Sequence, residues 1–150
     1  MPIRESYASG TPSFVDLATS DQPAAKTFYG SLFGWTYDDM PVDESTVYSM
    51  AKVAGKTVAA IAPQPPEQAA AGVPPHWQMY VTSTDVDAAA AKVEGAGGHL
   101  HAGPFDVFHA GRKAAVQDPP GAFFMLGDPD NHNAAGPVPG TGAAPWQGRR

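Results

Sequence analysis

Cysteine is absent from the 150 residues, and long apolar runs and an excess of positive charge are missing as well. Without cysteine the chain has no disulfide framework, no thiolate metal site and no cysteine nucleophile. A formal net charge of −6, with no readable basic patch, disfavours nucleic acid and anionic membrane as partners. No segment approaches the roughly 20 apolar residues of a membrane-spanning helix, and residues 1–11 lack the apolar run of a signal peptide. We therefore expect a cytoplasmic protein that binds neither nucleic acid nor membrane.

Glycine and proline, by contrast, are abundant, with 16 residues of each, and they gather in two segments. Residues 63–75 predict a Pro-rich linker between two modules of about 10–63 and 75–127. Residues 128–150 offer little apolar area to offset the entropy cost of ordering, so we expect a Gly/Pro-rich tail there. Because 43% of the residues are hydrophobic and this length suffices for one core, we expect a single domain over residues 1–127.

Two stretches 64 residues apart carry the same succession of signals, which indicates one unit built from two similar halves. In the first, residues 14–18 alternate as a half-buried strand does. Ser20 or Asp21 can then cap the N-terminus of a helix, and Gly34 can end it. The apolar face of this helix is expected to consist of Ala24, Ala25, Phe28 and Leu32. The second stretch repeats the strand, the cap and the final glycine at residues 76–82, Asp85 and Gly98.

Further strand patterns follow each of the two expected helices. In the first half, residues 47–52 and 56–62 predict a hairpin, with Gly55 in a left-handed turn position. In the second half the strand patterns cover residues 99–102, 113–117 and 122–126. Each half therefore predicts a strand, a helix and about three more strands.

Five short motifs accompany this order of elements: Thr-Pro-x-x-Val-Asp-Leu from Thr11, Leu-Phe-Gly-Trp-x-Tyr-Asp-Asp from Leu32, Val-Tyr-Ser-Met-Ala from Val47, Val-Ala-Ala-Ile-Ala-Pro from Val58 and Asp-Pro-x-Gly from Asp118. Together they resemble the vicinal oxygen chelate superfamily, which holds glyoxalase I, bleomycin-resistance proteins and extradiol dioxygenases. Within it, the chain is most similar to the actinobacterial glyoxalase-like proteins related to the mycobacterial 27 kDa antigen. The resemblance implies an α+β fold in which two β-α-β-β-β modules form a curved, eight-stranded, cup-shaped sheet with the helices outside. Since members of that subgroup usually carry two such domains in tandem, it also implies that this chain pairs with itself as a homodimer.

Enzymes of this superfamily bind a divalent metal in the cup through His, Gln and Glu side chains. The resemblance places the four ligand positions at Phe14, Ala60, Gln78 and Met125. Three of these side chains cannot bind a hard divalent ion, and one glutamine cannot hold such an ion alone. We therefore expect no metal and no other cofactor. Glyoxalase activity is not expected either, because that chemistry needs a metal to polarise the carbonyl.

Apolar side chains at three of these four positions would turn the cup into an aromatic slot. Such a wall suits a flat aromatic ligand, because stacked rings contribute roughly 0.5–1.5 kcal/mol beyond area burial. Plain core packing is the alternative for each single aromatic side chain. Strand alternation places five side chains on the cup side: Phe14, Gln78, Tyr80, Phe123 and Met125. Candidates for its rim or floor are Tyr48, Met50, Trp77, Phe105 and Phe108.

Asp16 lies on the same strand face as Phe14, so its carboxyl is expected inside the cup, where an unpaired charge is costly. In a functional role it would act as a general base, or accept a hydrogen bond from a ligand hydroxyl or amine. In a structural role it would cap nearby backbone amides or pair with Arg112.

Three functions remain open on these observations. The first, which we favour, is a metal-free protein that sequesters a hydrophobic aromatic compound, as antibiotic-binding proteins of the bleomycin-resistance type do. The second is a metal-independent lyase, hydrolase, isomerase or oxygenase that acts on an aromatic polyketide or an aldehyde adduct, with Asp16 as general base. The third is an interaction protein that docks through Trp146 in the tail. His99 and His101 alternate on one strand face, but without a carboxylate at matching spacing we favour an exposed edge strand over a metal site.

Overall fold

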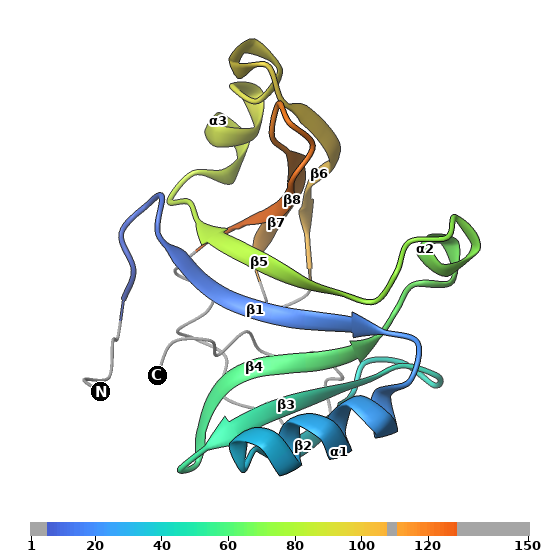
Figure 1. The fold of residues 1–150 in the computed structure, drawn as a ribbon. Coiled ribbons are helices and arrows are strands. Elements are labelled where there is room, and N and C mark those ends of the chain that lie inside the picture. Colours follow the sequence, from blue (N-terminus) through green and yellow to red (C-terminus); the bar gives the residue numbers. More distant parts are fainter. Residues whose placement is uncertain (1–5, 108–110, 129–150) are drawn as a thin grey trace.

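A computed structural model describes residues 6–107 and 111–128 of the chain. One eight-stranded mixed sheet, with strand order β2-β3-β4-β1-β5-β8-β7-β6, curls into a cup, and α1 and α3 lie on its outer side (Figure 1). The strands are β1 (Pro12–Thr19), β2 (Thr36–Pro41), β3 (Val47–Val53), β4 (Lys56–Pro63), β5 (His76–Thr82), β6 (His99–Asp106), β7 (Arg112–Gln117) and β8 (Phe123–Gly127). The helices are α1 (Gln22–Phe33), α2 (Pro66–Ala70), α3 (Val86–Ala91) and the short 3₁₀ helix η1 (Glu94–Ala96). Within the described ranges no helix is long and apolar enough to cross a membrane.

The sheet consists of two copies of the same β-α-β-β-β unit, which confirms the predicted fold class. In each unit the first strand runs parallel to the last, β1 beside β4 and β5 beside β8, and the units join where β1 pairs antiparallel with β5. The register sets Phe14 opposite Tyr80, Asp16 opposite Ala60, and Tyr80 opposite Met125. Because paired residues point to the same face of a sheet, the central strands gather these side chains inside the cup.

Both helices of the repeat begin as predicted. The carboxylate of Asp21 accepts a hydrogen bond from the backbone N–H of Ala24 at 2.9 Å, and that of Asp85 accepts one from Ala88 at 2.8 Å. These bonds satisfy amide groups that have no partner in the first helical turn. Gly34 ends α1 with a left-handed φ of 68°.

The end of the second helix differs from the prediction. α3 stops at Ala91, and the chain continues through η1, so the expected helix reaching Gly98 was wrong. Three of the four residues 95–98 are glycine, and each glycine costs about 1 kcal/mol in a helix interior. Gly97 takes a left-handed φ of 87°, which turns the chain toward β6.

The Pro-rich connection between the modules contains a helix that the sequence pattern did not indicate. Pro66 occupies the first turn of α2. The backbone N–H that proline lacks would have no carbonyl partner within the helix at this position. Just before it, the backbone N–H of Gln64 donates to the carbonyl of Thr19 at 2.8 Å, which ties the connection to the end of β1. α2 is thereby held beside the strand that carries Asp16.

α1 meets the sheet through Gln22 and Tyr29, while Phe28 and Phe33 remain exposed. The Gln22 side chain donates to the backbone oxygen of Ile61 on β4 at 2.9 Å. Phe28 and Leu32, which were expected on the apolar face, are 59% and 57% exposed, so the prediction of a buried face at these positions was wrong. Together with the exposed Phe33 they form what we call the α1 surface.

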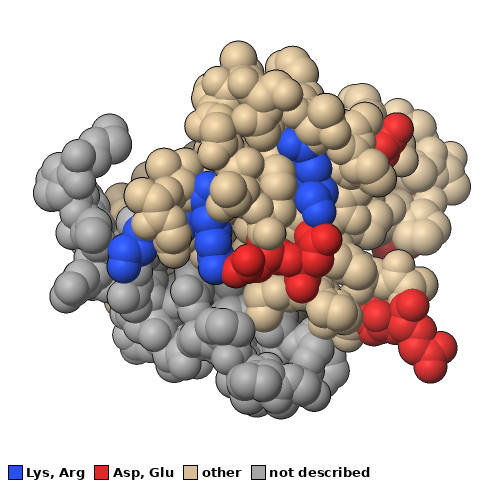
Figure 2. All heavy atoms as spheres, turned by 90° about the horizontal axis from the view of Figure 1, so that it is seen from below, with Lys and Arg blue, Asp and Glu red and all other residues tan. Residues whose placement is uncertain are grey.

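Figure 2 shows Lys and Arg side chains next to a group of acidic side chains near the middle of one face, while further acidic side chains lie apart from them. The ammonium group of Lys26 lies 2.7 Å from a carboxylate oxygen of Asp39, and Lys52 is paired with Asp38. Two of the chain's few lysines are thus neutralised by neighbouring carboxylates.

Candidate functional site

The floor of the cup is a cluster of buried side chains from both modules. Phe14, Met50, Ala60, Tyr80 and Met125 pack together there, and none is more than 7% exposed. The rings of Phe14 and Tyr80 meet edge to face, with their centroids 5.9 Å apart. The floor therefore joins strands β1, β3, β4, β5 and β8 into one apolar layer.

This floor contains three of the four positions at which the family resemblance implies metal ligands. Phe14, Ala60 and Met125 present only a ring, a methyl group and a thioether, and Gln78 adds a single amide. Over residues 6–107 and 111–128, no three histidine or acidic side chains come close enough to share an ion. These side chains do not fit a divalent metal, because such an ion takes several oxygen or nitrogen ligands.

Asp16 is the acidic group of the site. Its side chain is 4% exposed, and the hydroxyl of Tyr80 donates to Oδ2 at 3.1 Å. Within the described part of the chain, Oδ1 has no hydrogen-bond partner. Burial raises the pKa of Asp16 to about 7, although the Tyr80 hydrogen bond and the charge of Lys113 both lower it. Such a carboxyl can take up or release a proton near neutral pH.

Lys113, on β7, is the basic group of the site, and sequence reasoning missed it. The residue is 1% exposed, and its ammonium group lies 5.1 Å from the centre of the Tyr80 ring. Burial lowers the pKa of Lys113 to about 7, while the negative charge of Asp16 raises it. Alternation along β7, with Ala114 and Val116 packed beneath α3, could have assigned Lys113 to the cup side.

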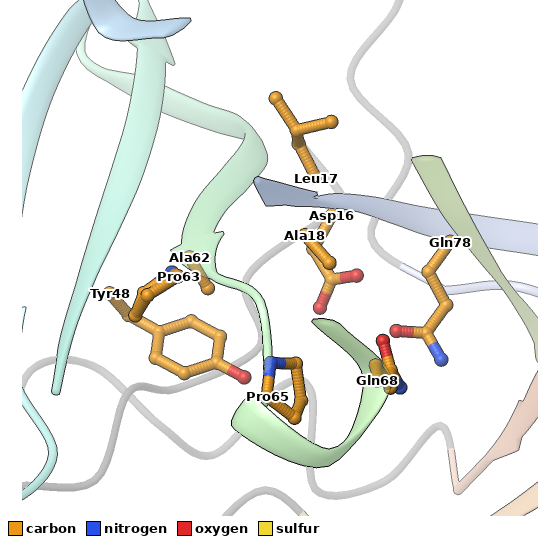
Figure 3. Close-up of a pocket in the computed structure, with 9 residues that line it drawn as sticks. All are labelled: Asp16, Leu17, Ala18, Tyr48, Ala62, Pro63, Pro65, Gln68 and Gln78. Atoms are coloured by element: carbon orange, nitrogen blue, oxygen red, sulfur yellow. The ribbon is translucent and has the colours of Figure 1, made fainter. Parts of the chain in front are cut away.

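A small pocket opens beside Asp16 at the mouth of the cup, with a cavity volume of about 70 Å³. In Figure 3 the carboxyl of Asp16 and the amide groups of Gln68 and Gln78 point toward the same space, and the Tyr48 ring closes another side. Burial, and after it the charge of Asp16, raises the pKa of Tyr48 to about 12, so its hydroxyl stays protonated at neutral pH. The pocket is lined by Asp16, Leu17, Ala18, Tyr48, Ala62, Pro63, Pro65, Gln68 and Gln78.

The structure brings several of the sequence-predicted site residues together. Phe14, Met50, Tyr80 and Met125 lie in the floor, while Asp16, Tyr48 and Gln78 line the pocket. Gln68 was missed, because its segment was interpreted as a linker.

The remaining aromatic candidates lie at the rim or elsewhere. Phe105 pairs with Lys113 across β6 and β7 and is 37% exposed. Phe123, 61% exposed, packs on the ring of His101 at 4.7 Å. Phe108 and Trp146 lie outside the described residues.

Trp77 corrects the prediction that it lies on the rim or floor of the cup. Its indole N–H donates to the hydroxyl of Tyr29 on α1 at 3.0 Å, and its ring meets that of Trp35 edge to face. The physical reason is strand alternation, because the neighbour of an inward-pointing Gln78 must point outward.

The predicted structural role in which Asp16 pairs with Arg112 was also wrong. Arg112 instead binds the carboxylates of Asp87 and Asp106.

A family model and several curated proteins match this sequence. The family model described as the glyoxalase/bleomycin resistance protein/dioxygenase superfamily matches residues 11–126. "Putative glyoxylase CFP32" of Mycobacterium tuberculosis is 49% identical over 97% of this chain and 56% of its own length. "Anthracycline biosynthesis protein DnrV" of Streptomyces peucetius is 36% identical over 80% of this chain and 47% of its own length. The chain thus spans about half the length of the curated relatives it matches.

A solved structure supports the same fold at lower identity. The methylmalonyl-CoA epimerase of Mycobacterium tuberculosis superposes with a TM-score of 0.58 at 17% identity, covering 82% of this chain and 91% of that one. At this identity the likeness concerns the fold alone. The family model, in contrast, matches residues 11–126, and this range includes both modules and the five sequence motifs. The chain belongs to the glyoxalase/bleomycin resistance protein/dioxygenase superfamily.

Proposed function

We propose that this protein binds a hydrophobic aromatic compound in the cup without help from a metal ion. The observation that carries the proposal is the apolar floor at the positions of the implied metal ligands, with Asp16 and the pocket at its edge. An apolar wall with a few convergent polar groups is the usual make-up of a small-molecule site. The cavity of about 70 Å³ accepts one edge of a ring, and the rest of the ligand extends through the open mouth.

The name of one relative supports an aromatic ligand. DnrV is named for the biosynthesis of anthracyclines, and an anthracycline is a fused-ring aromatic compound. A role for this chain in holding such a compound, as in antibiotic sequestration, follows by analogy and is part of the proposal.

A second candidate is a metal-independent enzyme that moves a proton. It rests on Asp16, whose buried carboxyl has a pKa of about 7 and is oriented by the Tyr80 hydroxyl. Such a group can abstract a proton from a ligand hydroxyl or an activated C–H and return it to product. Recovery of the ligand unchanged after long incubation favours binding, whereas turnover that is lost in Asp16→Asn favours the enzyme.

Binding itself is tested by titrating the protein with 2-naphthol and following heat release by calorimetry. We expect saturable binding with one ligand per cup, because one ring edge fills one pocket. A control variant, Met125→Lys, places a charge in the apolar floor and is expected to abolish binding; circular dichroism checks that it is folded. No saturable heat with the wild-type protein would contradict the proposal.

A homodimer, expected from the sequence, is also part of the proposal. The α1 surface exposes Phe28, Leu32 and Phe33 side by side on one helix, and a second copy would bury this apolar area. We expect Leu32→Glu to shift the protein from dimer to monomer in analytical ultracentrifugation, whereas Ser31→Glu, the same charge one residue away, leaves it dimeric. A wild-type protein that sediments as a monomer at all concentrations would contradict this.

A further inference from the structure

Two buried oxygen atoms in the pocket have no hydrogen-bond partner in the described part of the chain: Oδ1 of Asp16 and Oε1 of Gln68. They come from different elements, β1 and α2, and both groups point into the same pocket (Figure 3). A buried acceptor left without a donor costs about 1–3 kcal/mol, so such atoms are rare in native proteins. Their convergence on one cavity indicates that a group beyond the described residues, such as a bound ligand, supplies the hydrogen atoms.

None of the described residues that line the pocket donates a hydrogen bond to either oxygen. Leu17, Ala18 and Ala62 are apolar, and Pro63 and Pro65 lack a backbone N–H as well as a polar side chain. The two remaining lining residues, Tyr48 and Gln78, carry polar groups, yet neither donates to Asp16 Oδ1 or Gln68 Oε1. These two oxygen atoms therefore still need hydrogen-bond donors.

The charges around the pocket decide which kind of donor fits. The positive charge of Lys113 acts on Asp16 from inside the cup. A ligand ammonium group placed against Asp16 would lose its hydration in this poorly solvated space, and Lys113, whenever it is protonated, would repel it. A neutral hydroxyl group donates its hydrogen without bringing a second positive charge, and a phenol places that hydrogen at the edge of an apolar ring.

We propose that the pocket selects a neutral aromatic ligand whose ring edge carries hydroxyl groups, one donating to Asp16 Oδ1 and another to Gln68 Oε1. This inference rests on the proposed function and names the chemical class of its ligand. The hydroxylated edge enters the pocket, and the apolar part of the ring system extends through the open mouth.

The test compares four naphthalene probes by calorimetry at pH 7.5. They are 2,3-dihydroxynaphthalene, 2-naphthol with one donor, 2,3-dimethylnaphthalene with the same shape and no donor, and the cationic 2-naphthylmethylamine. We expect the diol to bind at least about tenfold more tightly than the dimethyl probe, since tenfold corresponds to about 1.4 kcal/mol and two acceptors become paired.

Two variants assign the effect to the pocket. Gln68→Leu is expected to bring the affinity for the diol down to that for 2-naphthol, because only Asp16 Oδ1 then remains. Glu67→Gln, which changes the exposed neighbour on α2, is expected to leave all affinities as in the wild type.

The outcomes separate the inference from the proposed function. If the dimethyl probe binds as tightly as the diol, the cup binds aromatic rings but the selection of hydroxyl groups is overturned. If the ammonium probe binds more tightly than the diol, the choice of a neutral donor is overturned. If none of the four probes binds, the proposed function and this inference fail together.

Discussion

Asp16→Asn is expected to stabilise the protein above neutral pH and at the same time to weaken ligand binding. The pKa of Asp16 is about 7 in the folded state against its ordinary value of 3.8, so between these values the folded state holds a proton that the unfolded state has lost. Stability therefore falls as pH rises from about 4 to 7. At pH 8 the neutral asparagine removes this penalty, which amounts to about 4 kcal/mol at 1.36 kcal/mol per pKa unit.

The loss of binding has a separate cause. A hydrogen bond to a charged acceptor contributes about 1.5–3 kcal/mol, so replacing the carboxylate by an amide is expected to weaken 2,3-dihydroxynaphthalene binding roughly 10- to 100-fold. Chemical denaturation at pH 5 and pH 8, together with calorimetry, measures both effects. Glu44→Gln, at an exposed position, serves as the control and should change neither. A destabilised Asp16→Asn protein that still binds the diol normally would show that Asp16 is structural.

Lys113→Met is expected to stabilise the protein most at acidic pH. The folded-state pKa of Lys113 is about 7 against its ordinary value of 10.5, so between pH 7 and 10.5 the unfolded state binds more protons and stability rises with pH. Below pH 7 the buried ammonium group costs about 5 kcal/mol, which methionine removes. The stabilisation by Lys113→Met should therefore be several kcal/mol larger at pH 6 than at pH 10 in denaturation experiments.

The same variant also has an expected effect on Asp16. Without the positive charge of Lys113, the pKa of Asp16 rises, so the carboxylate that accepts the ligand hydroxyl appears only at higher pH. The pH midpoint of diol binding should move upward in Lys113→Met, which a merely structural lysine would not cause. Lys56→Met, at an exposed position on β4, should leave the midpoint where it is. An unchanged midpoint in Lys113→Met would contradict the coupling of the two groups.

Local signals were enough to predict the repeat and its helix starts. Asp21 and Asp85 both cap helices as expected, because capping depends on a few neighbouring atoms. Alternation also sufficed to place Phe14, Tyr80 and Met125 inside the cup. These features depend on backbone geometry that adjacent residues set.

The features that were missed depend on contacts between distant segments. Phe28 appeared to belong to a buried helix face, but α1 contacts the sheet through Gln22 and Tyr29, and Phe28 is exposed. Gln68 reached the pocket only because α2 is tied to the end of β1. Lys113 was overlooked because a buried lysine is rare, and its position in the cup depends on strand pairing across the second module.

We propose that an organic ring binds in the pocket beside Asp16, and that the positions at which the family resemblance implies metal ligands hold no metal ion. The most direct measurement is elemental analysis of the protein equilibrated with zinc, nickel and iron salts, followed by titration with 2,3-dihydroxynaphthalene before and after chelation. We expect far less than one metal ion per chain and the same affinity with and without chelator. One divalent ion per chain whose removal abolishes binding would contradict it.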